Sequence, residues 1–261
     1  MSLPAGSQSD TLVILTGASR GLGEAMALQY LAAGARVLGL SRRDSAALEA
    51  AGAGARLEQW RVDLATPLPV VDRLQAWLAG LQRGAAGMPP GRVRLIHNAA
   101  LLSSPGNVGD GDAAEMAVSL RVGVEAPIAL TAGFLRATGH WSASDRRVLF
   151  VSSGLGRRPM AGSAAYCAQK AALDHFARAL ALEERSRSQG ARVAAVAPGV
   201  IDTDMQRQLR GADVASFPEG VHFDELPRSG ALASPGAAAA RMLALLERAD
   251  FGEKPVTDVR D

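Results

Sequence analysis

The chain is poor in cysteine, tyrosine and lysine. Its 261 residues include one cysteine and two tyrosines, and only Lys170 and Lys254 are lysines, so arginine supplies nearly all of the positive charge. The single Cys167 excludes an internal disulfide framework and suits a reducing compartment. The formal net charge is only +2, and the arginines form scattered pairs without a basic run, so nucleic acid is not an expected partner.

Other absences narrow the class of protein further. The four histidines lie far apart without the spacing of metal ligands, so no metal site is expected. Residues 1–10 lack the positive and apolar regions of a secretory signal and are expected to form a flexible tail. The apolar stretches are interrupted before they reach membrane length, as Glu115, Arg121 and Glu125 show before Pro127. We therefore expect a cytoplasmic protein with no membrane partner.

Short apolar runs alternate with longer helical patterns along the chain. Apolar residues make up 48% and charged residues 21%, which fits one soluble α/β domain of this length. Strands are predicted at 11–16, 36–40, 57–62, 93–96, 147–152, 192–196 and 255–258, with helical patterns such as 22–33, 68–81, 113–135 and 164–188 between them. Residues 11–261 are thus predicted to form a single-domain, Rossmann-type, doubly wound parallel sheet of about seven strands. Helices should cover both faces, and ligands should bind at the carboxyl ends of the strands.

A glycine-rich turn follows the first predicted strand. It reads Thr16-Gly-Ala-Ser-Arg-Gly-Leu-Gly23 and opens a helix. Glycines let the backbone approach a pyrophosphate closely, and the helix N-terminus offers N–H groups and a positive dipole. The spacing differs from the Gly-x-Gly-x-x-Gly dinucleotide fingerprint, so an ordinary strand-to-helix turn is the alternative. As cofactor-binding residues we predict Gly17, Ser19, Arg20, Gly21, Leu22 and Gly23.

The end of the second predicted strand bears on the choice of cofactor. It reads Ser41-Arg42-Arg43, at the position where an acidic residue would accept the hydroxyl groups of an adenosine ribose. Serine replaces the acid here, and the guanidinium of Arg42 matches the geometry of a phosphate group. A solvated surface arginine is the alternative. The sequence therefore predicts NADP(H) in preference to NAD(H), with Arg20 nearby in the glycine turn.

One of the two tyrosines lies four residues before a lysine, in Tyr166-Cys-Ala-Gln-Lys170. On a helix, residues four apart share a face, so the phenol and the ammonium would point into the same space. A nearby cation favours phenolate and lowers a tyrosine pKa from its usual ~10 toward neutrality, which makes a general acid or base. Ser153 follows the fifth predicted strand, and a helix beginning near Ala164 would bring Tyr166 beside it.

These motifs occur in one order along the chain. The order is the glycine turn, Asp63, His97-Asn-Ala-Ala100, Ser153, Tyr166-x-x-x-Lys170 and Pro198-Gly199. The same motifs occur in the same order in the single-domain short-chain dehydrogenase/reductase family, which the chain resembles from Thr11 onward. The motifs are highly specific together, although no single one of them is.

The resemblance implies a role for each matching residue. Ser153 would hydrogen-bond the substrate oxygen, Tyr166 would exchange a proton with it, and Lys170 would lower the Tyr166 pKa and bind the nicotinamide ribose. Asp63 would accept a hydrogen bond from the adenine amino group, with capping of a turn as its alternative role. The implied catalytic set is Ser153, Tyr166 and Lys170, and the implied cofactor contacts are Asp63, Asn98, Ala99, Tyr166, Lys170, Pro198, Val200 and Thr203.

Two positions depart from the family's pattern. His97 stands where the family usually begins Asn-Asn-Ala-Gly, and we expect it to pack or hydrogen-bond rather than to shuttle protons. Gly123 stands eight residues before Thr131, where the family has an Asn that helps to hold a lysine-linked water. We therefore expect that Gly123→Asn leaves activity unchanged or raises it.

The later motifs narrow the resemblance to one branch of the family. Ser152-Ser-Gly-Leu-Gly, Val196–Asp204 and Thr257–Asp261 are most similar to the sepiapterin and benzil reductase branch, which implies reduction of a dicarbonyl or α-hydroxyketone group. Residues 205–234 show no clear periodicity and little dense charge. This segment is expected to cover a small, fairly apolar carbonyl substrate, through residues such as Met205, Leu209 and Phe217.

The sequence therefore predicts an NADPH-dependent carbonyl reductase with Tyr166 as the proton donor. One alternative is an NADP-dependent alcohol dehydrogenase that runs in the oxidative direction with the same residues. Another is a catalytically lapsed NADPH-binding sensor or scaffold, for which Gly123 is the only indication. The family further implies a homodimer or homotetramer assembled through long helices, including the helix that carries Tyr166.

Overall fold

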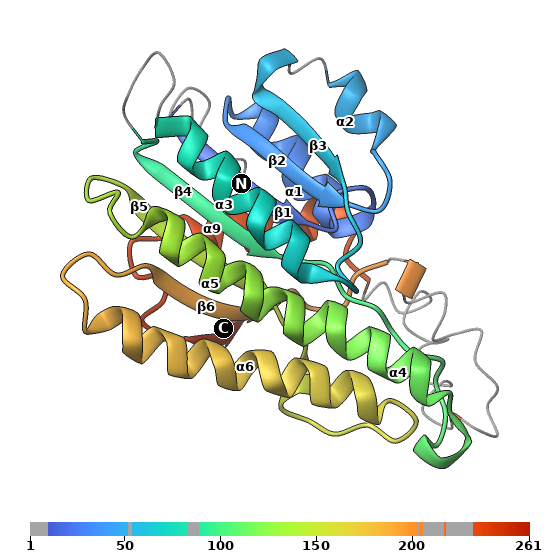
Figure 1. Cartoon of the computed structure of the whole chain (residues 1–261). Helices are drawn as coiled ribbons and strands as arrows, with labels where there is room; N and C mark the ends of the chain where they lie inside the picture. The colour runs from blue at the N-terminus through green and yellow to red at the C-terminus, as the bar shows by residue number, and fades with distance from the viewer. Residues whose placement is uncertain (1–9, 52–53, 83–88, 203, 206–216, 218–231) are drawn as a thin grey trace.

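Seven parallel strands form one sheet in the order β3-β2-β1-β4-β5-β6-β7 (Figure 1). The computed structural model describes residues 10–51, 54–82, 89–202, 204–205, 217 and 232–261. The strands are β1 (Thr11–Thr16), β2 (Arg36–Ser41), β3 (Leu57–Arg61), β4 (Arg92–His97), β5 (Asp145–Val151), β6 (Arg192–Ala197) and β7 (Val256–Asp258). Each neighbouring pair is parallel, which confirms the predicted doubly wound sheet.

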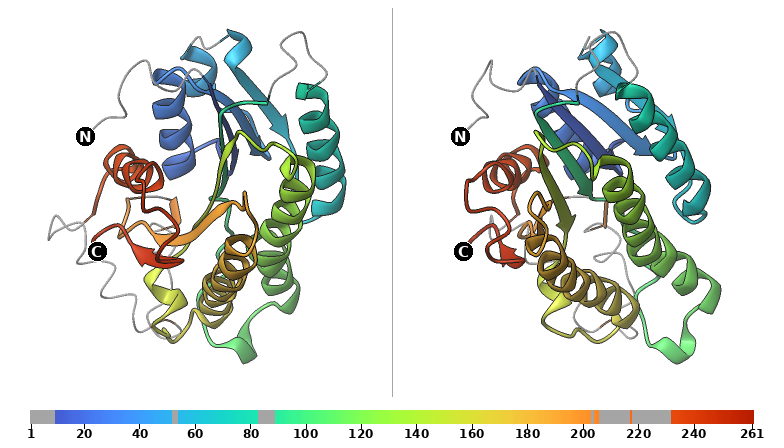
Figure 2. Two further views of the ribbon diagram at one scale, coloured as in Figure 1. Left: turned by 90° about the vertical axis from the view of Figure 1, so that its left-hand side faces the viewer. Right: turned by 60° about the vertical axis from the view of Figure 1, so that its left-hand side comes forward.

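Helices cover both faces of this sheet (Figure 2). One face carries α3 (Pro67–Gln82), α4 (Ala113–Leu120), α5 (Ala126–Thr138) and α6 (Ala164–Arg185), and the other carries α1 (Gly21–Ala32) and α9 (Pro235–Leu246). A π-helical turn, η3 (Arg121–Glu125), joins α4 to α5. The shorter elements are α2 (Ala46–Ala50) and the 3-10 turns η1 (Gly54–Arg56), η2 (Val108–Asp110) and η4 (Gly154–Gly156).

The alternation of side chains along the strands builds a separate core on each face. All six residues of β1 are buried. Leu12 and Ile14 belong to the cluster beneath α3, α5 and α6, whereas Val13 and Leu15 belong to the cluster beneath α1 and α9. Successive side chains of a strand point to opposite faces, so an uninterrupted apolar run serves both cores. This explains why the strands read as continuous apolar runs in the sequence.

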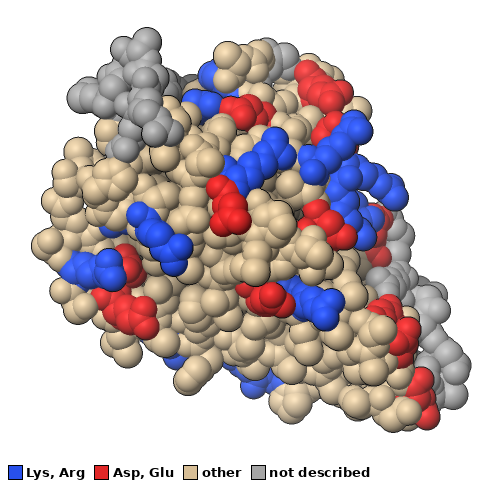
Figure 3. Space-filling model, in the orientation of Figure 1, with Lys and Arg blue, Asp and Glu red and all other residues tan. Residues whose placement is uncertain are grey.

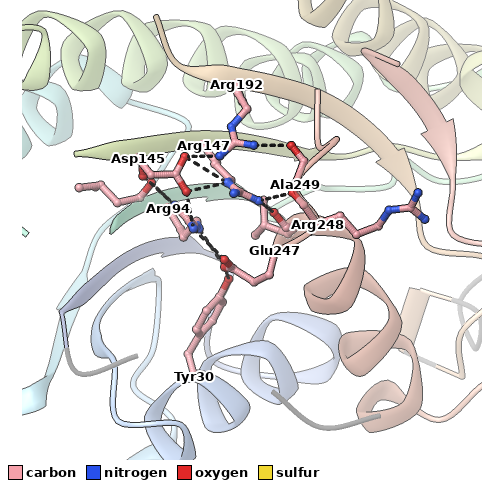
Figure 4. Close-up of polar contacts among 10 residues, drawn as sticks. Tyr30, Arg94, Asp145, Arg147, Arg192, Glu247, Arg248 and Ala249 are labelled. Atoms are coloured by element: carbon pink, nitrogen blue, oxygen red, sulfur yellow. Dashed lines mark hydrogen bonds and ion pairs between the residues drawn. The ribbon is translucent and has the colours of Figure 1, made fainter. Parts of the chain in front are cut away.

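The amino ends of the central strands are tied to the helices by a buried ionic cluster (Figure 4). The guanidinium of Arg94 is fully buried and forms ion pairs with Asp145 at 3.0 Å and with Glu247 at 2.7 Å. The hydroxyl of Tyr30, from α1, donates to Glu247 Oε1 at 2.8 Å. We call the set Tyr30, Arg94, Asp145, Arg147, Arg192 and Glu247 the Arg94 cluster.

Two further arginines of the cluster hold the end of α9. Arg147 donates to the carbonyls of Leu246 and Arg248, and Arg192 donates to the carbonyl of Ala249 at 2.6 Å. Cations are favourable at a helix C-terminus because the last carbonyls lack intrahelical partners. The cluster thus fixes α9 against the sheet, at the end of the strands away from their carboxyl edge.

Helices α4 and α5 continue one another through η3 as a single apolar stretch. Among the described residues, Ala113–Thr138 is the one helix whose length and composition would allow it to cross a membrane. Half of the most apolar part of this helix is buried inside the protein, as in a helix that packs on the core of a sheet.

The chain reverses its direction of winding between β1 and β4. From β1 it proceeds outward through β2 and β3, and then returns to place β4 on the other side of β1. Thr16 pairs with His97 at the carboxyl ends of these two strands. Such a switch point opens a crevice in which ligands bind in doubly wound folds. The residues predicted for function gather at this edge.

Candidate active site

A cleft of about 1070 Å³ lies at the carboxyl ends of the strands. Of the predicted site residues, its lining includes Gly17, Ser19, Arg20, Gly21, Leu22, Arg42, Asp63, Asn98, Ala99, Ser153, Tyr166, Lys170, Pro198 and Val200. Gly23 belongs to the described residues but not to the lining of the cleft, whereas Thr203 lies outside the described residues. The fold therefore brings into one cavity residues that are spread over most of the sequence.

The glycine turn forms one end of the cleft. Gly17 has φ +71° and Gly21 has φ +57°, in the left-handed region that favours glycine. A Cβ on Gly23 would overlap with the carbonyl oxygen of Gly17, so Gly23 serves the close packing of the turn on itself. Within the described part of the chain, no side chain caps the N-terminus of α1. Its first-turn N–H groups therefore suit an anion such as a pyrophosphate.

Hydrogen bonds across the switch point hold this turn in place. The hydroxyl of Thr16 accepts from the backbone N–H groups of Asn98 and Ala99, both at 3.1 Å. The side-chain amide of Asn98 in turn donates to the carbonyls of Thr16 at 3.2 Å and Gly17 at 3.1 Å. Asn98 thus lines the cleft and also joins the loop after β4 to the glycine turn.

Basic side chains surround the part of the cleft next to β2. Arg42 and Arg43 line it and form no hydrogen bond or ion pair with any described residue. The nearby Asp44 is paired with Arg61 at 2.6 Å, which neutralises its carboxylate. Basic side chains gather beside acidic ones over this β2–β3 edge (Figure 3). At the position predicted for a phosphate there are thus two guanidinium groups that no described residue pairs with.

Two other predicted cofactor contacts have additional partners. The carboxylate of Asp63 lines the cleft and also accepts from the N–H of Ala65 at 2.9 Å, so it caps a turn as well. Arg20 forms an exposed ion pair with Asp204 at 2.7 Å. This pair links the glycine turn to the loop that follows β6.

Ser153 and Tyr166 meet on the wall of the cleft. Ser153 caps η4, where its Oγ accepts from the N–H of Leu155 at 3.2 Å. Tyr166 faces the cleft on one side and protein on the others, and this burial raises its pKa to about 12 against the lowering effect of a hydrogen bond with Ser153. The expectation from the Tyr-x-x-x-Lys spacing, a tyrosine pKa lowered toward neutrality, is therefore wrong for the protein in this form. Desolvation outweighs the effect of that hydrogen bond.

The low pKa of Lys170 explains why its charge has so little effect on the phenol, because the lysine loses its charge below the pH at which the phenol ionises. Its Nζ donates to the carbonyl of Val151 at 2.8 Å and lies 5.5 Å from the centre of the Tyr166 ring. Burial lowers the pKa of Lys170 to about 8, although the nearby Asp174 opposes this shift. The lysine is therefore a cation only below about that pH.

The sequence interpretation missed a polar group behind the lysine. Asp174 lies one helical turn after Lys170 on α6, is almost fully buried and accepts a hydrogen bond from the hydroxyl of Ser152. Arg157 lies 3.7 Å from its other oxygen. Burial raises the pKa of Asp174. The spacing of four residues between Lys170 and Asp174 was the available signal, since it puts both on one helix face.

The two departures from the family's pattern occupy very different surroundings. His97 is buried, stacks on Phe150 with ring centres 5.0 Å apart and shares a hydrogen bond of 2.8 Å with Thr131 Oγ1. Burial lowers the pKa of His97 to about 3, so it is neutral and serves packing, as expected. Gly123 is covered by the side chain of Gln169, with which any Cβ at position 123 would overlap. The structure contradicts the reasoning behind a harmless Gly123→Asn, because the space for an Asn is filled.

The substrate end of the cleft includes residues on both sides of the segment expected to cover it. Met205 lines the cleft, whereas Leu209 lies outside the described residues. Phe217 is not among the described lining residues and instead packs, fully buried, against Met160, which does line the cleft. The sequence interpretation assigned no role to Arg158, Asp258 and Arg260, which also line the cavity. Within the described residues, no group of three or more histidine, cysteine or acidic side chains could hold a metal ion.

Comparison with known proteins agrees with this geometry. The family profile described as short chain dehydrogenase matches residues 11–213. The chain is 31% identical to the benzil reductase ((S)-benzoin forming) of Bacillus cereus over 94% of this chain and 97% of that protein. It is 33% identical to the sepiapterin reductase of Meriones unguiculatus, with 95% of each chain covered. The chain belongs to the short-chain dehydrogenase family, in agreement with the resemblance of its motifs.

Solved structures of this family share the fold. KRED1-Pglu superposes with a TM-score of 0.77 at 26% identity, covering 94% of this chain and 99% of that chain. A short-chain dehydrogenase of Escherichia coli CFT073 complexed with NADPH gives a TM-score of 0.73 at 25% identity, covering 97% and 98%. As a member of this family, the protein is an oxidoreductase that acts on CH–OH or C=O groups of small molecules with a nicotinamide cofactor.

Proposed function

We propose that the protein is an NADPH-dependent reductase of small ketones or dicarbonyl compounds, with Tyr166 as the proton donor. The observation that carries this proposal is the meeting of Ser153, Tyr166 and Lys170 on the wall of the cleft that the glycine turn closes at its other end. The names of the relatives, benzil reductase and sepiapterin reductase, support a carbonyl substrate.

The residues of the cleft fit a dinucleotide with a 2′-phosphate. The uncapped first turn of α1 suits the pyrophosphate, and Gly17 and Gly21 leave room for its approach. Arg42 and Arg43 would pair with the 2′-phosphate, since they form no ion pair with a described residue. Asp63, Asn98, Ala99, Pro198 and Val200 would hold the rest of the cofactor, and Thr203 and Gly23 remain proposed contacts of the same group.

The chemistry follows from the positions of the hydroxyl groups. NADPH, when bound, supplies the hydride. The hydroxyls of Ser153 and Tyr166 would hold the carbonyl oxygen of the substrate and stabilise the negative charge that develops on it. Tyr166 would then donate its proton to that oxygen, and a pKa of about 12 keeps this proton in place at neutral pH. Lys170, anchored on Val151, would add positive charge behind the phenol and bind the ribose.

Consumption of NADPH tests the proposal. Wild-type protein, incubated with NADPH and benzil or another 1,2-diketone, should lower the absorbance at 340 nm. Tyr166→Phe should reduce kcat by roughly 10²- to 10⁴-fold, because it removes the proton donor and keeps the ring. Its dissociation constant for NADPH, followed by the change in cofactor fluorescence, should stay close to that of wild type. Tyr30→Phe is the matched control, since the hydroxyl of this other tyrosine donates to Glu247 in the Arg94 cluster, away from the cleft.

Two other results would favour the alternatives. Turnover confined to NADP with alcohol substrates would point to a dehydrogenase that works in the oxidative direction. Binding of NADPH without turnover across a wide panel of carbonyl compounds would point to a sensor whose chemistry has lapsed. Either pattern would overturn the proposed reductase.

We also propose a homodimer or homotetramer in the cytoplasm. The supporting observation is a set of exposed apolar side chains on the helices of one face, namely Leu120 on α4, Ile128 on α5 and Leu182 on α6, of which Leu182 is 68% exposed. Contacts between copies would cover these side chains. Light scattering of the purified protein checks the oligomer, and Leu182→Glu should shift it toward monomer.

A further inference from the structure

The side chain of Gln169 occupies the space that a side chain at position 123 would need. A Cβ built on Gly123 would overlap with Cδ, Nε2 and Cγ of Gln169. Gly123 is the central residue of the π-helical turn η3, and Gln169 comes from α6, which runs alongside the α4–α5 helix (Figure 1). Single π-helical turns are frequent at functional sites. Here the wide turn and the missing side chain together make room for the glutamine.

Gln169 joins three segments of the chain through its buried amide. The residue is fully buried, and its Nε2 donates to the carbonyl of Ser119 at 2.8 Å and to that of Leu101 at 3.3 Å. Ser119 stands at the end of α4, and its carbonyl is the one that a regular helix would offer to the N–H of Gly123. The amide therefore supports the backbone where the helix is widened.

The other half of the same amide is its carbonyl oxygen, Oε1. No described residue donates a hydrogen bond to Gln169 Oε1, although the atom is buried. Buried polar atoms without partners are rare in proteins and call for an explanation in terms of function or bound water. The amide thus offers an acceptor inside the protein, on the residue that directly precedes Lys170 in the sequence.

Gln169 stands directly behind the wall of the cleft. It precedes Lys170 in the sequence and follows Tyr166 by three residues, so it shares a helical face with the tyrosine. Leu101 and Val122 line the cleft. Gln169 donates to the carbonyl of Leu101 and lies against Gly123, the residue after Val122. A shift of the amide would move both wall residues and the segment of α6 that carries Lys170.

We propose that Gln169 is a positioning residue for Lys170, and that Gly123 and Gln169 act as an exchanged pair. The carboxamide that the family's pattern would place on the α4–α5 helix comes from α6 instead. It holds the wide turn and α6 together so that the ammonium stays on the Val151 carbonyl, and its Oε1 offers the acceptor that glycine lacks. This inference rests on the proposed reductase activity for its kinetic consequences.

A double-mutant cycle tests the exchange. Gly123→Asn alone should lower kcat about tenfold, because it forces out a buried side chain that makes two hydrogen bonds. Gln169→Ala alone should lower kcat about tenfold and move the basic limb of the pH profile to lower pH, because Lys170 loses its fixed position. The double variant restores an amide in the vacated space and should recover to within about threefold of wild type.

Binding of NADPH supplies a second readout that needs no turnover. Each single variant should raise its dissociation constant about three- to tenfold, and the double variant should reverse most of the change. Gln189→Ala, an exposed glutamine beyond the end of α6, is the matched control and should behave as wild type. Thermal unfolding is recorded for all variants, so that a loss of folded protein is separated from a loss of function.

Several outcomes would overturn the inference. Gln169→Ala with wild-type kcat, pH profile and NADPH affinity would do so, even if its melting temperature fell, because the role would then be purely structural. A double variant no better than the worse single variant would do so as well. If wild type reduces no carbonyl compound, the proposed function fails, and the cycle in NADPH affinity still decides whether the pair is coupled.

Discussion

The ammonium of Lys170 is hydrogen-bonded to the carbonyl of Val151 at 2.8 Å, so the charge of the active site is anchored to the end of β5. Val151 directly precedes Ser152 and Ser153, and the lysine is therefore fixed relative to the strand that presents Ser153. The two titrating groups are pushed in opposite directions by burial, to about 12 for the pKa of Tyr166 and about 8 for that of Lys170. The lysine, and not the tyrosine, is the group that changes charge near neutral pH.

The rate of carbonyl reduction should accordingly fall as the pH rises through about 8. Below that pH Lys170 is a cation, and above it the cation is lost, whereas the phenol keeps its proton on both sides. A profile of kcat against pH with saturating NADPH measures this limb. In Lys170→Met the rate should be lower by about 10²-fold or more, and this residual rate should not decrease as the pH rises through about 8. An identical limb in wild type and in this variant would assign the titration to another group.

Preference for NADPH should depend on the arginines after β2. Arg42→Ala and Arg43→Ala should each weaken NADPH binding roughly ten- to hundredfold, since hydrogen bonds to charged groups contribute about 1.5–3 kcal/mol. Binding of NADH should change little, because it lacks the 2′-phosphate. Arg136→Ala, an exposed arginine on α5, is the matched control. Equal losses for both cofactors would show that the arginines do not read the phosphate, and titrations of NADPH and NADH decide this.

The Arg94 cluster should govern stability without affecting the chemistry. Arg94→Leu leaves Glu247 and Asp145 without their buried partner, and loss of one partner of a buried ion pair typically lowers the free energy of unfolding by about 3–5 kcal/mol. The activity of the folded fraction should stay at the wild-type level, because no residue of the cluster is among the described residues that line the cleft.

Urea unfolding followed by circular dichroism measures the effect of Arg94→Leu. Arg248→Ala removes an exposed ion pair with Asp250 and serves as the control, with little change expected. A loss of stability equally small in Arg94→Leu would contradict a structural role for the cluster.

Most of the fold and the cleft could be predicted from the sequence because their signals are local. The strands of the sheet alternate with helices along the chain, and the glycine turn and the Tyr166–Lys170 spacing each lie within a few residues. The covering of Gly123 by Gln169 could not be predicted in this way, since it depends on how α6 packs against the α4–α5 helix.

The direction of the Tyr166 pKa escaped prediction for a similar reason. Spacing along a helix shows that a lysine is near a tyrosine, but not that its ammonium is held by Val151 or that burial dominates. The partners of Arg94 were hidden as well, because Asp145 and Glu247 lie 51 and 153 residues away in the sequence. In each case the missing information is the packing between distant elements.

The buried His97 should make the protein less stable in mild acid. Its pKa is about 3 in the folded state and near 6.5 when unfolded, so the unfolded chain binds more protons below pH 6.5. The stability that His97 contributes is therefore fully present above pH 6.5 and decreases as the pH falls toward 3, by up to about 1.4 kcal/mol per pH unit from this group.

His97→Asn removes the titration and keeps a donor and an acceptor near Thr131. Between pH 7 and pH 5, wild type should lose about 2 kcal/mol more of its free energy of unfolding than His97→Asn does. Urea unfolding at the two pH values measures the difference, and His175→Asn, an exposed histidine on α6, should behave as wild type. Equal losses in wild type and His97→Asn would mean that His97 is not held neutral by the fold.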